Sequence, residues 1–335
     1  MFVLGIESTC DETACAIVQD GKHILANLVA SQHDLHTKYG GVFPEVACRR
    51  HVEIIGPLVK QALADAGITK NELGLISAAK GPGLIGALII GINMAKGLAF
   101  GLKKPFVGVN HVEAHLYAAM MHQDAPIFPA LGVVISGGHT FLVRIEGIGK
   151  YSLIGTTVDD AIGEAFDKVA VMLGLPYPGG PAVEALALRG DPTRFSFKAG
   201  KVKGRPWDFS FSGLKTSVLY AVKGPANDKR LSEEDRPHVA AAFQETALGN
   251  IVEKSLQAIA AFDCRAIYLG GGVSNNRRLR DLFSQKSPVP VFWPPLNLSL
   301  DNAVMIAGLG YHQFLQHGAA PLSLPPQARI SLSLL

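Results

Sequence analysis

Two histidines with helical spacing are the clearest sign of chemistry in this sequence. His111 and His115 lie in the segment VNHVEAHLYAAMM. On a helix, residues i and i+4 share one face, so the two imidazoles can bind the same metal ion. Two ordinary surface histidines have the same spacing, and for the pair by itself this alternative stays open.

The position of the neighbouring acid argues against a zinc peptidase. In the motif HExxH the general-base Glu directly follows the first His, whereas this chain has Val112 there. Glu113 lies roughly 200° around the helix from His111, at about 100° per residue. Asp301, at the expected start of a later helix, offers a third ligand. Two His and one carboxylate leave coordination positions open and suit iron or another divalent metal.

Two carboxylates occupy the first expected turn of the chain. Asp11 and Glu12 lie in STCDET, between two apolar strands. A carboxylate on such a loop can orient a nucleophile or accept its proton. Turns also favour Asp for its local hydrogen bonds, so a purely structural role is the alternative.

Glycine-rich loops are the third set of candidates. SGGHT (136–140) and GGVSNN (271–276) each follow an expected strand, and their backbone N–H groups can approach an anion closely. A plain hairpin turn accounts equally well for the first loop. Helix packing is the favoured interpretation of GPGLIGAL (81–88), and a turn is that of PGGP (178–181); for both loops a ligand-binding role is the alternative.

The elements that must position these residues form a pattern that occurs twice. Residues 1–30 read as strand, polar turn, strand, Gly turn and strand, and residues 131–157 repeat this order. Helices and short strands follow each meander. We expect helices over 48–66, 84–101, 160–174, 212–223, 232–262 and from Asn276, with strands over 73–79, 105–110 and 265–270. An internal duplication with two α/β lobes and a cleft between them is the predicted fold.

Composition limits the class of protein. The 335 residues are 48% hydrophobic and 18% charged, with a formal net charge of +3, which is typical of a globular protein and too small to identify a nucleic-acid binder. No basic segment precedes the apolar start, and the apolar stretch 83–102 contains Asn93 and Lys96, so we expect a buried helix and no membrane span. Four cysteines without CxxC spacing indicate reduced thiols and a cytoplasmic protein.

Nine motifs in order resemble the tRNA N6-adenosine threonylcarbamoyltransferase family TsaD, formerly called O-sialoglycoprotein endopeptidase or glycoprotease. They are ESTCDET, GPGLIGAL, HVEAH, SGGHT, DDAIGEAFDKVA, YPGGP, FSFSGLKT, GGVSNNRRLR and DNAVMIA, and they cover nearly the whole chain. The resemblance implies duplicated ribonuclease H-like lobes of the actin/sugar-kinase/Hsp70 superfold, with a nucleotide-binding cleft between them. We expect an N-terminal lobe of residues 1–127 plus about 300–335, and a C-terminal lobe of residues 128–299.

The resemblance also implies roles for individual residues. The expected metal ligands, usually for iron, are His111, His115 and Asp301, and Asp11 is the expected catalytic acid with Glu12 beside it. The expected adenylate-binding residues are Val134, Ile135, Ser136, Gly137, Gly138, Asp167, Gly180, Glu184 and Asn276. Glu184 stands where an Asp is common, which puts that contact in doubt. Ala79, Ala114 and Asn275 are smaller departures from the family pattern.

The implied reaction transfers a threonylcarbamoyl group from threonylcarbamoyl-AMP to the adenosine 3′ of the anticodon, in tRNAs reading codons that begin with A. ATP or ADP can occupy the same nucleotide site. The expected partners are the tRNA anticodon loop, a TsaB-like paralogue and a TsaE-like ATPase, with the adenylate supplied by a TsaC-type enzyme. We expect Asp11 to accept or steer the proton of the adenine amine, and the metal to stabilise developing charge.

Two basic segments are candidates for tRNA binding. RFSFKAGKVKGRPW (194–207) combines five cations with three aromatic residues and no acid, and NRRLR (276–280) is the second candidate. A solvated loop is the alternative for the first segment.

Three other classes of protein share parts of this pattern. A superfold ATPase or sugar kinase would share the phosphate loops without needing the His pair and Asp301. A metallopeptidase is disfavoured by the displaced acid. A non-catalytic scaffold would be expected to lack Asp11 and the metal set, which this chain retains.

Overall fold

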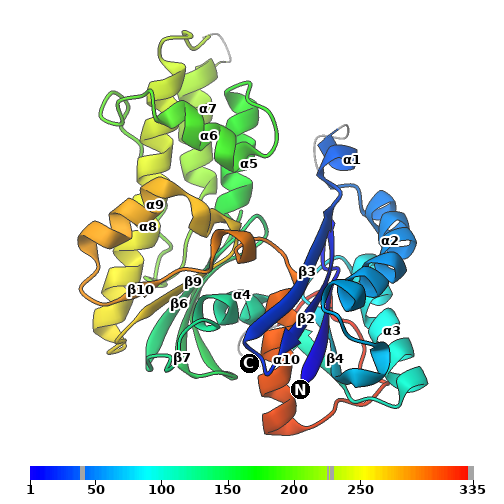
Figure 1. Cartoon of the computed structure of the whole chain (residues 1–335). Helices are drawn as coiled ribbons and strands as arrows, with labels where there is room; N and C mark the ends of the chain where they lie inside the picture. The colour runs from blue at the N-terminus through cyan, green and yellow to red at the C-terminus, as the bar shows by residue number, and fades with distance from the viewer. Residues whose placement is uncertain (38–41, 225, 227–229, 331–335) are drawn as a thin grey trace. The chain divides into compact units, whose positions relative to one another are not determined.

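The computed structural model describes residues 1–37, 42–224, 226 and 230–330. The chain divides into two compact units. Unit 1 comprises Met1–Pro126 and Pro294–Leu335, and unit 2 comprises Ile127–Trp293. Each unit is built on a five-stranded sheet with helices packed on it (Figure 1).

Unit 1 has the sheet order β3-β2-β1-β4-β5. β2 pairs antiparallel with β1 and β3, whereas β4 pairs parallel with β1 and β5. Its strands are β1 (Phe2–Glu7), β2 (Glu12–Gln19), β3 (His23–Ser31), β4 (Leu73–Gly81) and β5 (Phe106–Asn110). Its helices are α1 (His33–Thr37), α2 (Pro44–Asp65), α3 (Ile85–Leu102), α4 (His111–Met120) and α10 (Ala303–His317), with short 3₁₀ turns η1 (Lys70–Glu72) and η3 (Leu296–Leu298).

Unit 2 repeats this arrangement with the sheet order β10-β9-β6-β7-β8. β7 pairs antiparallel with β6 and β8, and β9 pairs parallel with β6 and β10. Its strands are β6 (Ala130–Ile135), β7 (Thr140–Gly147), β8 (Lys150–Thr156), β9 (Ile267–Gly270) and β10 (Val291–Phe292). Its helices are α5 (Ile162–Met172), α6 (Gly179–Ala187), α7 (Ser212–Lys223), α8 (Arg236–Ala261), α9 (Arg277–Lys286) and the 3₁₀ turn η2 (Gly272–Asn275).

The predicted duplication is confirmed. Both sheets consist of an antiparallel meander followed by two parallel strands, added in the same order at the same side of the first strand. The period of two identified the strands of both meanders, and the helical period that follows them identified most of the helices.

Strand β1 is central in the sheet of unit 1 and has helices packed on both of its faces. Side chains alternate across a strand, so Leu4 and Ile6 enter the core that also contains Ile55 of α2 and Ile92 of α3. Gly5 faces the other layer, where a Cβ atom would lie 2.2 Å from the carbonyl oxygen of Ala303. Glycine at this position therefore allows the first turn of α10 to approach the sheet closely.

Two expectations about local structure were wrong. Helix α3 is not buried on all sides, because only 33% of it is buried and Ile85, Ile89 and Phe100 are exposed. By length and composition alone, this helix could cross a membrane. The inner face packs on the sheet through small residues, and the sheet covers only that face. PGGP is not a simple turn, because Gly179 begins α6 after Pro178.

We expect Gly5→Ala to destabilise the protein by about 1–3 kcal/mol, since the added methyl group overlaps backbone atoms of α10 that have no room to move. Urea unfolding followed by circular dichroism measures this loss. Gly97→Ala in α3 is the matched control, because nothing lies within 4 Å of its Cβ position; it should be neutral or stabilising by up to about 1 kcal/mol. Equal stability of the two variants would contradict the tight approach of α10.

Candidate functional site

The His pair occupies the first turns of α4, directly after the end of β5. Asn110 caps this helix, since its Oδ1 accepts hydrogen bonds from the backbone N–H groups of Val112 and Glu113 at 2.9 and 3.2 Å. The side chains of His111 and His115 are almost fully buried. Their rings pack edge to face with centroids 4.7 Å apart, so the helix presents both imidazoles on one face, as predicted.

Asp301 lies next to both imidazoles, although 186 residues separate it from His115. Its Oδ1 is 3.5 Å from His111 Nε2 and 3.1 Å from His115 Nε2. One ligand atom from each of the three residues lies within 4.8 Å of the others. Asn302 fixes this segment: its Oδ1 accepts from Met305 N, and its amide donates to the carbonyls of Leu298 and Leu300.

The electrostatics of this group favour a cation. Burial by itself would lower the pKa of His111, but Glu7 and Asp301 outweigh burial and raise the pKa to about 9. A proton on His111 supplies one positive charge among these carboxylates, and a divalent metal would supply two. The donor set of two imidazoles and one carboxylate fits such an ion, with positions left for other ligands.

The loop between β1 and β2 brings more acid to the same place. Burial, together with the charges of Asp301 and Asp11, raises the pKa of Glu12 to about 9, and Glu12 shares a hydrogen bond with Asp11. Burial and the same acids raise the pKa of the Cys10 thiol, which keeps it protonated. Glu12 therefore carries a proton at neutral pH, and the two predicted carboxylates of the loop are neighbours of the Asp301 carboxylate.

The buried side chain of His51 in α2 hydrogen-bonds to both ends of this loop. Its Nε2 lies 3.0 Å from the carbonyl oxygen of Cys10, which only accepts, so Nε2 donates. Nδ1 then accepts from the hydroxyl of Thr13 at 2.7 Å. The side chain of His51 is fully buried, and burial lowers its pKa. His51 is not among the residues predicted from the sequence, because nothing in its helical spacing distinguishes it from a core residue.

In unit 2, the loop SGGHT joins β6 to β7. Val134 and Ile135 are buried strand residues whose backbones pair within the sheet, so their side chains cannot face a ligand. Gly137 and Gly138 are exposed beyond the strand, and nothing lies within 4 Å of their Cβ positions. The absence of a side chain at these two residues leaves room for a ligand to approach the backbone.

A chain of contacts joins this loop to the other predicted nucleotide residues. The carbonyl of Ser136 accepts from Gly163 N at the start of α5 (3.2 Å). One turn later in α5, Asp167 Oδ1 accepts from Gly179 N at 2.7 Å, and burial raises the pKa of Asp167 although the N–H groups of Gly179 and Gly180 partly offset this. Gly180 also has open space at its Cβ position.

The same chain continues to α9. Glu184 of α6 accepts from Arg277 N at 2.8 Å. Asn276 caps α9 by accepting from Leu279 N at 3.1 Å, and its amide donates to Gln244. Gly271, at the start of the same loop, returns to β6, since its Cβ position is 2.4 Å from the carbonyl of Ile135. These contacts link the predicted residues of unit 2 into one continuous set, which we call the rim of unit 2: Ser136, Gly137, Gly138, Asp167, Gly180, Glu184 and Asn276. The rim includes the first turns of α6 and α9.

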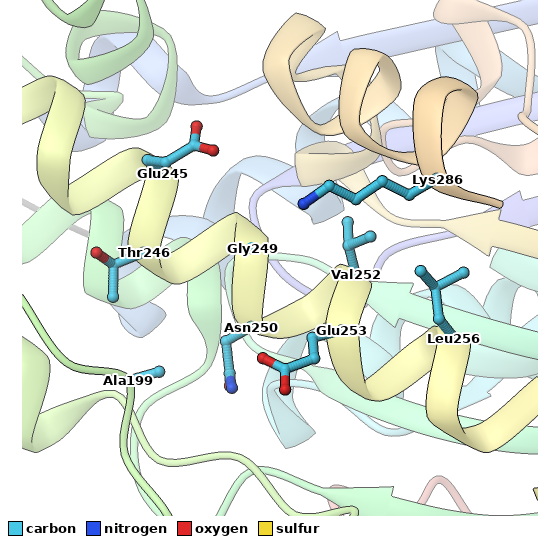
Figure 2. A pocket seen from close by; sticks show the side chains of 9 residues that line it. All are labelled: Ala199, Glu245, Thr246, Gly249, Asn250, Val252, Glu253, Leu256 and Lys286. Carbon is cyan, nitrogen blue, oxygen red and sulfur yellow. The ribbon is translucent and has the colours of Figure 1, made fainter. Parts of the chain in front are cut away.

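A separate cavity of about 420 Å³ lies along α8 (Figure 2). None of the predicted site residues lines it. One of its two acidic residues, Glu245, already forms a bidentate ion pair with Arg278 at 2.7 and 2.9 Å. The residues that line the cavity are Ala199, Glu245, Thr246, Gly249, Asn250, Val252, Glu253, Leu256 and Lys286.

Comparisons with known proteins identify the family of the chain. A sequence model of the TsaD family, described as tRNA N6-adenosine threonylcarbamoyltransferase, matches residues 23–308. A relative of that name from Protochlamydia amoebophila (strain UWE25) is 60% identical over 338 residues, covering 99% of this chain and 98% of the relative. One from Chlamydia trachomatis serovar L2b is 50% identical over 334 residues, covering 98% of each.

Solved structures at low sequence identity share the fold. Component A of (R)-2-hydroxyglutaryl-CoA dehydratase from Acidaminococcus fermentans has a TM-score of 0.55 at 14% identity, covering 93% of this chain and 98% of that one. The ROK hexokinase of Thermus thermophilus has a TM-score of 0.52 at 14% identity, covering 94% and 99%. The predicted superfold is confirmed.

The buried neutral His51 predicts a pH dependence of stability. Because its folded pKa lies below the ordinary value of 6.5, the unfolded chain takes up a proton at His51 first as the pH falls, and the contribution of His51 to stability is lost progressively below about pH 6.5. Urea unfolding of metal-free protein between about pH 7.5 and 5.5 measures this slope. His51→Gln should remove this contribution to the slope, whereas the exposed control His122→Gln should leave the slope unchanged. Identical slopes in the wild type and in His51→Gln would refute the assignment.

Proposed function

This chain belongs to the tRNA N6-adenosine threonylcarbamoyltransferase family TsaD and is a transferase that modifies tRNA. We propose that it moves the threonylcarbamoyl group from threonylcarbamoyl-AMP to N6 of the adenosine 3′ of the anticodon, in tRNAs reading codons that begin with A. The observation that carries this proposal is the convergence of His111, His115 and Asp301 beside the acidic loop of Asp11 and Glu12.

The two imidazoles and Asp301 would hold one divalent metal ion, for which we propose iron(II). Such an ion would supply positive charge to oxygens of the donor that become more negative during transfer. The ligands are held in place before any ion binds, because Asn110 and Asn302 cap the two helices that present them.

Asp11 is the group that we assign to proton transfer. The adenine amine is a weak nucleophile, because its lone pair is delocalised into the ring. As N6 bonds to the carbamoyl carbon, the bond from that carbon to the phosphate oxygen breaks, and AMP leaves with the electron pair. The N6 proton passes to Asp11. Glu12 keeps its own proton and hydrogen-bonds to Asp11, which leaves Asp11 as the acceptor of the pair.

We assign the nucleotide to the rim of unit 2. The backbone of Ser136 to Gly138, the open position at Gly180 and the helix start at Asn276 are suited to a phosphate and the adenosine. ATP or ADP would fit the same groups. Glu184 gives one oxygen to Arg277 N, so its second oxygen is the group that we assign to a ribose hydroxyl, together with Asp167.

Three lysines are our candidates for the tRNA backbone. In the segment 194–207, Arg194 pairs with Asp235 and Arg205 with Asp208, while Phe195, Phe197 and Trp207 pack against the core of unit 2. Lys198, Lys201 and Lys203 are exposed and have no ion pair within the described part of the chain. In the other basic segment, Arg278 pairs with Glu245 and Arg280 lies over Trp293. We therefore assign phosphate binding first to the three lysines, with the exposed Arg277 as the remaining cation of the second segment.

We expect the protein to work in the cytoplasm with companions. The exposed apolar residues Ile85, Ile89 and Phe100 lie on the outer side of α3 and are 49%, 43% and 76% exposed. An exposed apolar face of this kind is suited to a partner, and we assign it to the TsaB-like paralogue. A TsaE-like ATPase would act on that assembly, and a TsaC-type enzyme would supply the adenylate.

Reconstitution tests the reaction. Purified protein incubated with unmodified tRNA, threonine, bicarbonate, ATP and the companion proteins should produce threonylcarbamoyladenosine, detected by mass spectrometry of the nucleosides. His111→Ala should abolish product, and Asp11→Asn should lower the transfer rate by about 100-fold or more while the donor still binds. His122→Ala, an exposed residue just beyond α4, is the control and should retain activity. Transfer by Asp11→Asn at the wild-type rate would refute the proton role.

The salt dependence of tRNA binding tests the lysines. Replacing Lys198, Lys201 and Lys203 by Gln should weaken binding and reduce the slope of log affinity against log salt by about 2–3, since each lost phosphate contact removes about 0.7–0.9. Filter binding at several salt concentrations measures the slope. The triple Lys→Arg variant keeps the charges and should keep the slope. An unchanged slope in the Gln variant would place the tRNA elsewhere.

A further inference from the structure

The two histidines of the candidate metal set differ in what their second ring nitrogen contacts. His111 Nδ1 lies 2.9 Å from Glu7 Oε2. His115 Nδ1 is buried and has no hydrogen-bond partner among the residues that the structure describes. Only one of the two expected ligands is therefore held in orientation by a charged group.

Glu7 is a fully buried carboxylate at the last position of β1. Its second oxygen, Oε1, accepts from the backbone N–H of Thr9 at 2.6 Å. Both oxygens are thus in use, one on the helix that carries the histidines and one on the loop that carries Asp11. Burying a carboxylate is costly unless its hydrogen bonds are made. An apolar residue at position 7 would therefore stabilise the core more, which indicates that Glu7 has a role beyond packing.

The contact with Glu7 determines which nitrogen of His111 can bind a metal. A carboxylate only accepts hydrogen bonds, so Nδ1 must carry a proton and donate it. In a neutral ring the other nitrogen, Nε2, then has a free lone pair, and Nε2 is the atom that faces Asp301. We propose that Glu7 is a positioning residue that holds the proton of His111 on Nδ1 and orients the ring, so that Nε2, and not Nδ1, is the nitrogen that binds the ion. This inference rests on the proposed metal site.

Glu7→Gln changes this arrangement in a specific way. A glutamine has one oxygen and one NH₂ group, whereas Thr9 N and His111 Nδ1 both donate. If the oxygen stays on Thr9, the NH₂ group faces Nδ1, which must then accept, and the proton moves to Nε2 where the metal would bind. If the amide turns over, a donor faces the backbone N–H of Thr9 and the loop loses its contact. Either outcome weakens metal binding.

Metal affinity is the primary test. Cobalt(II) titration of metal-free protein, followed by the visible absorption of the bound ion, should show about 10–100-fold weaker binding in Glu7→Gln than in the wild type, the usual effect of removing a hydrogen-bond partner from a metal-binding His. Glu113→Gln is the matched control. Glu113 is a similarly buried acid two residues from His111, and its Oε2 accepts a hydrogen bond from the side chain of Gln313. The cobalt affinity of Glu113→Gln should therefore match that of the wild type.

The zinc-loaded protein gives an independent readout. In the wild type, ¹⁵N-correlated spectra of the histidines should show His111 protonated at Nδ1, with that proton shifted downfield by its bond to the carboxylate. The shift should be lost in Glu7→Gln and kept in Glu113→Gln. If Glu7→Gln does not fold, Glu7→Asp serves instead, because a side chain one methylene shorter withdraws the carboxylate from Nδ1 and should weaken cobalt binding as well.

The outcomes separate the two proposals. Wild-type protein that bound no cobalt would overturn the metal site itself and the role of Glu7 with it. Tight binding by the wild type and equally tight binding by the Glu7 variants would overturn only the role of Glu7. Loss of affinity in Glu113→Gln to the same degree would also overturn it, since any buried acid near α4 would then have the same effect.

Discussion

The site in unit 1 is organised by the need to balance buried negative charge. Glu7, Asp301 and the loop acids surround two imidazoles in a place with little access to water, where carboxylates without a counterion are costly. Protons on His111 and Glu12 reduce this charge in the absence of other cations. A divalent ion between the imidazoles and Asp301 would balance it more fully, and the rest of unit 1 is arranged to keep these groups together.

Several ordinary structural features serve that arrangement. Asn110 and Asn302 each cap a helix next to a proposed ligand, so the orientation of the ligand is fixed by backbone hydrogen bonds. Gly5 allows α10 to lie close to the sheet, which brings Asp301 to the end of β1. His51 anchors the loop of Asp11 from the opposite side. A metal site built at the starts of two helices is more rigid than one built on loops alone.

The equivalent hairpin loops of the two units carry side chains suited to different chemistry. The hairpin after the first strand of unit 1 carries acids, whereas the equivalent hairpin of unit 2, SGGH, carries glycines and a hydroxyl. The first is suited to accept protons and cations, and the second to approach a phosphate. The turns at the starts of α6 and α9 add backbone N–H groups to the second set. Both sets lie at the end of the same strand in a repeated topology, which follows the general rule that sites form at the carboxyl ends of parallel strands.

Local sequence pattern was enough to identify the family and most of the strands and helices. Alternating apolar residues identified both meanders, and the spacing of His111 and His115 placed them on one helical face, because these periods are properties of the strand and the helix themselves. Local pattern was less informative where the outcome depends on what a segment packs against: PGGP begins a helix, and one side of α3 stays exposed. Only the tertiary structure placed Asp301 beside histidines far away in the chain, and gave Arg278 and Arg280 internal partners. Glu7 and His51 likewise owe their contacts to neighbouring elements. The spacing of residues predicts which side chains lie one helical turn apart. The partner of a buried polar group depends instead on how the helices pack against the sheet, which local spacing does not show.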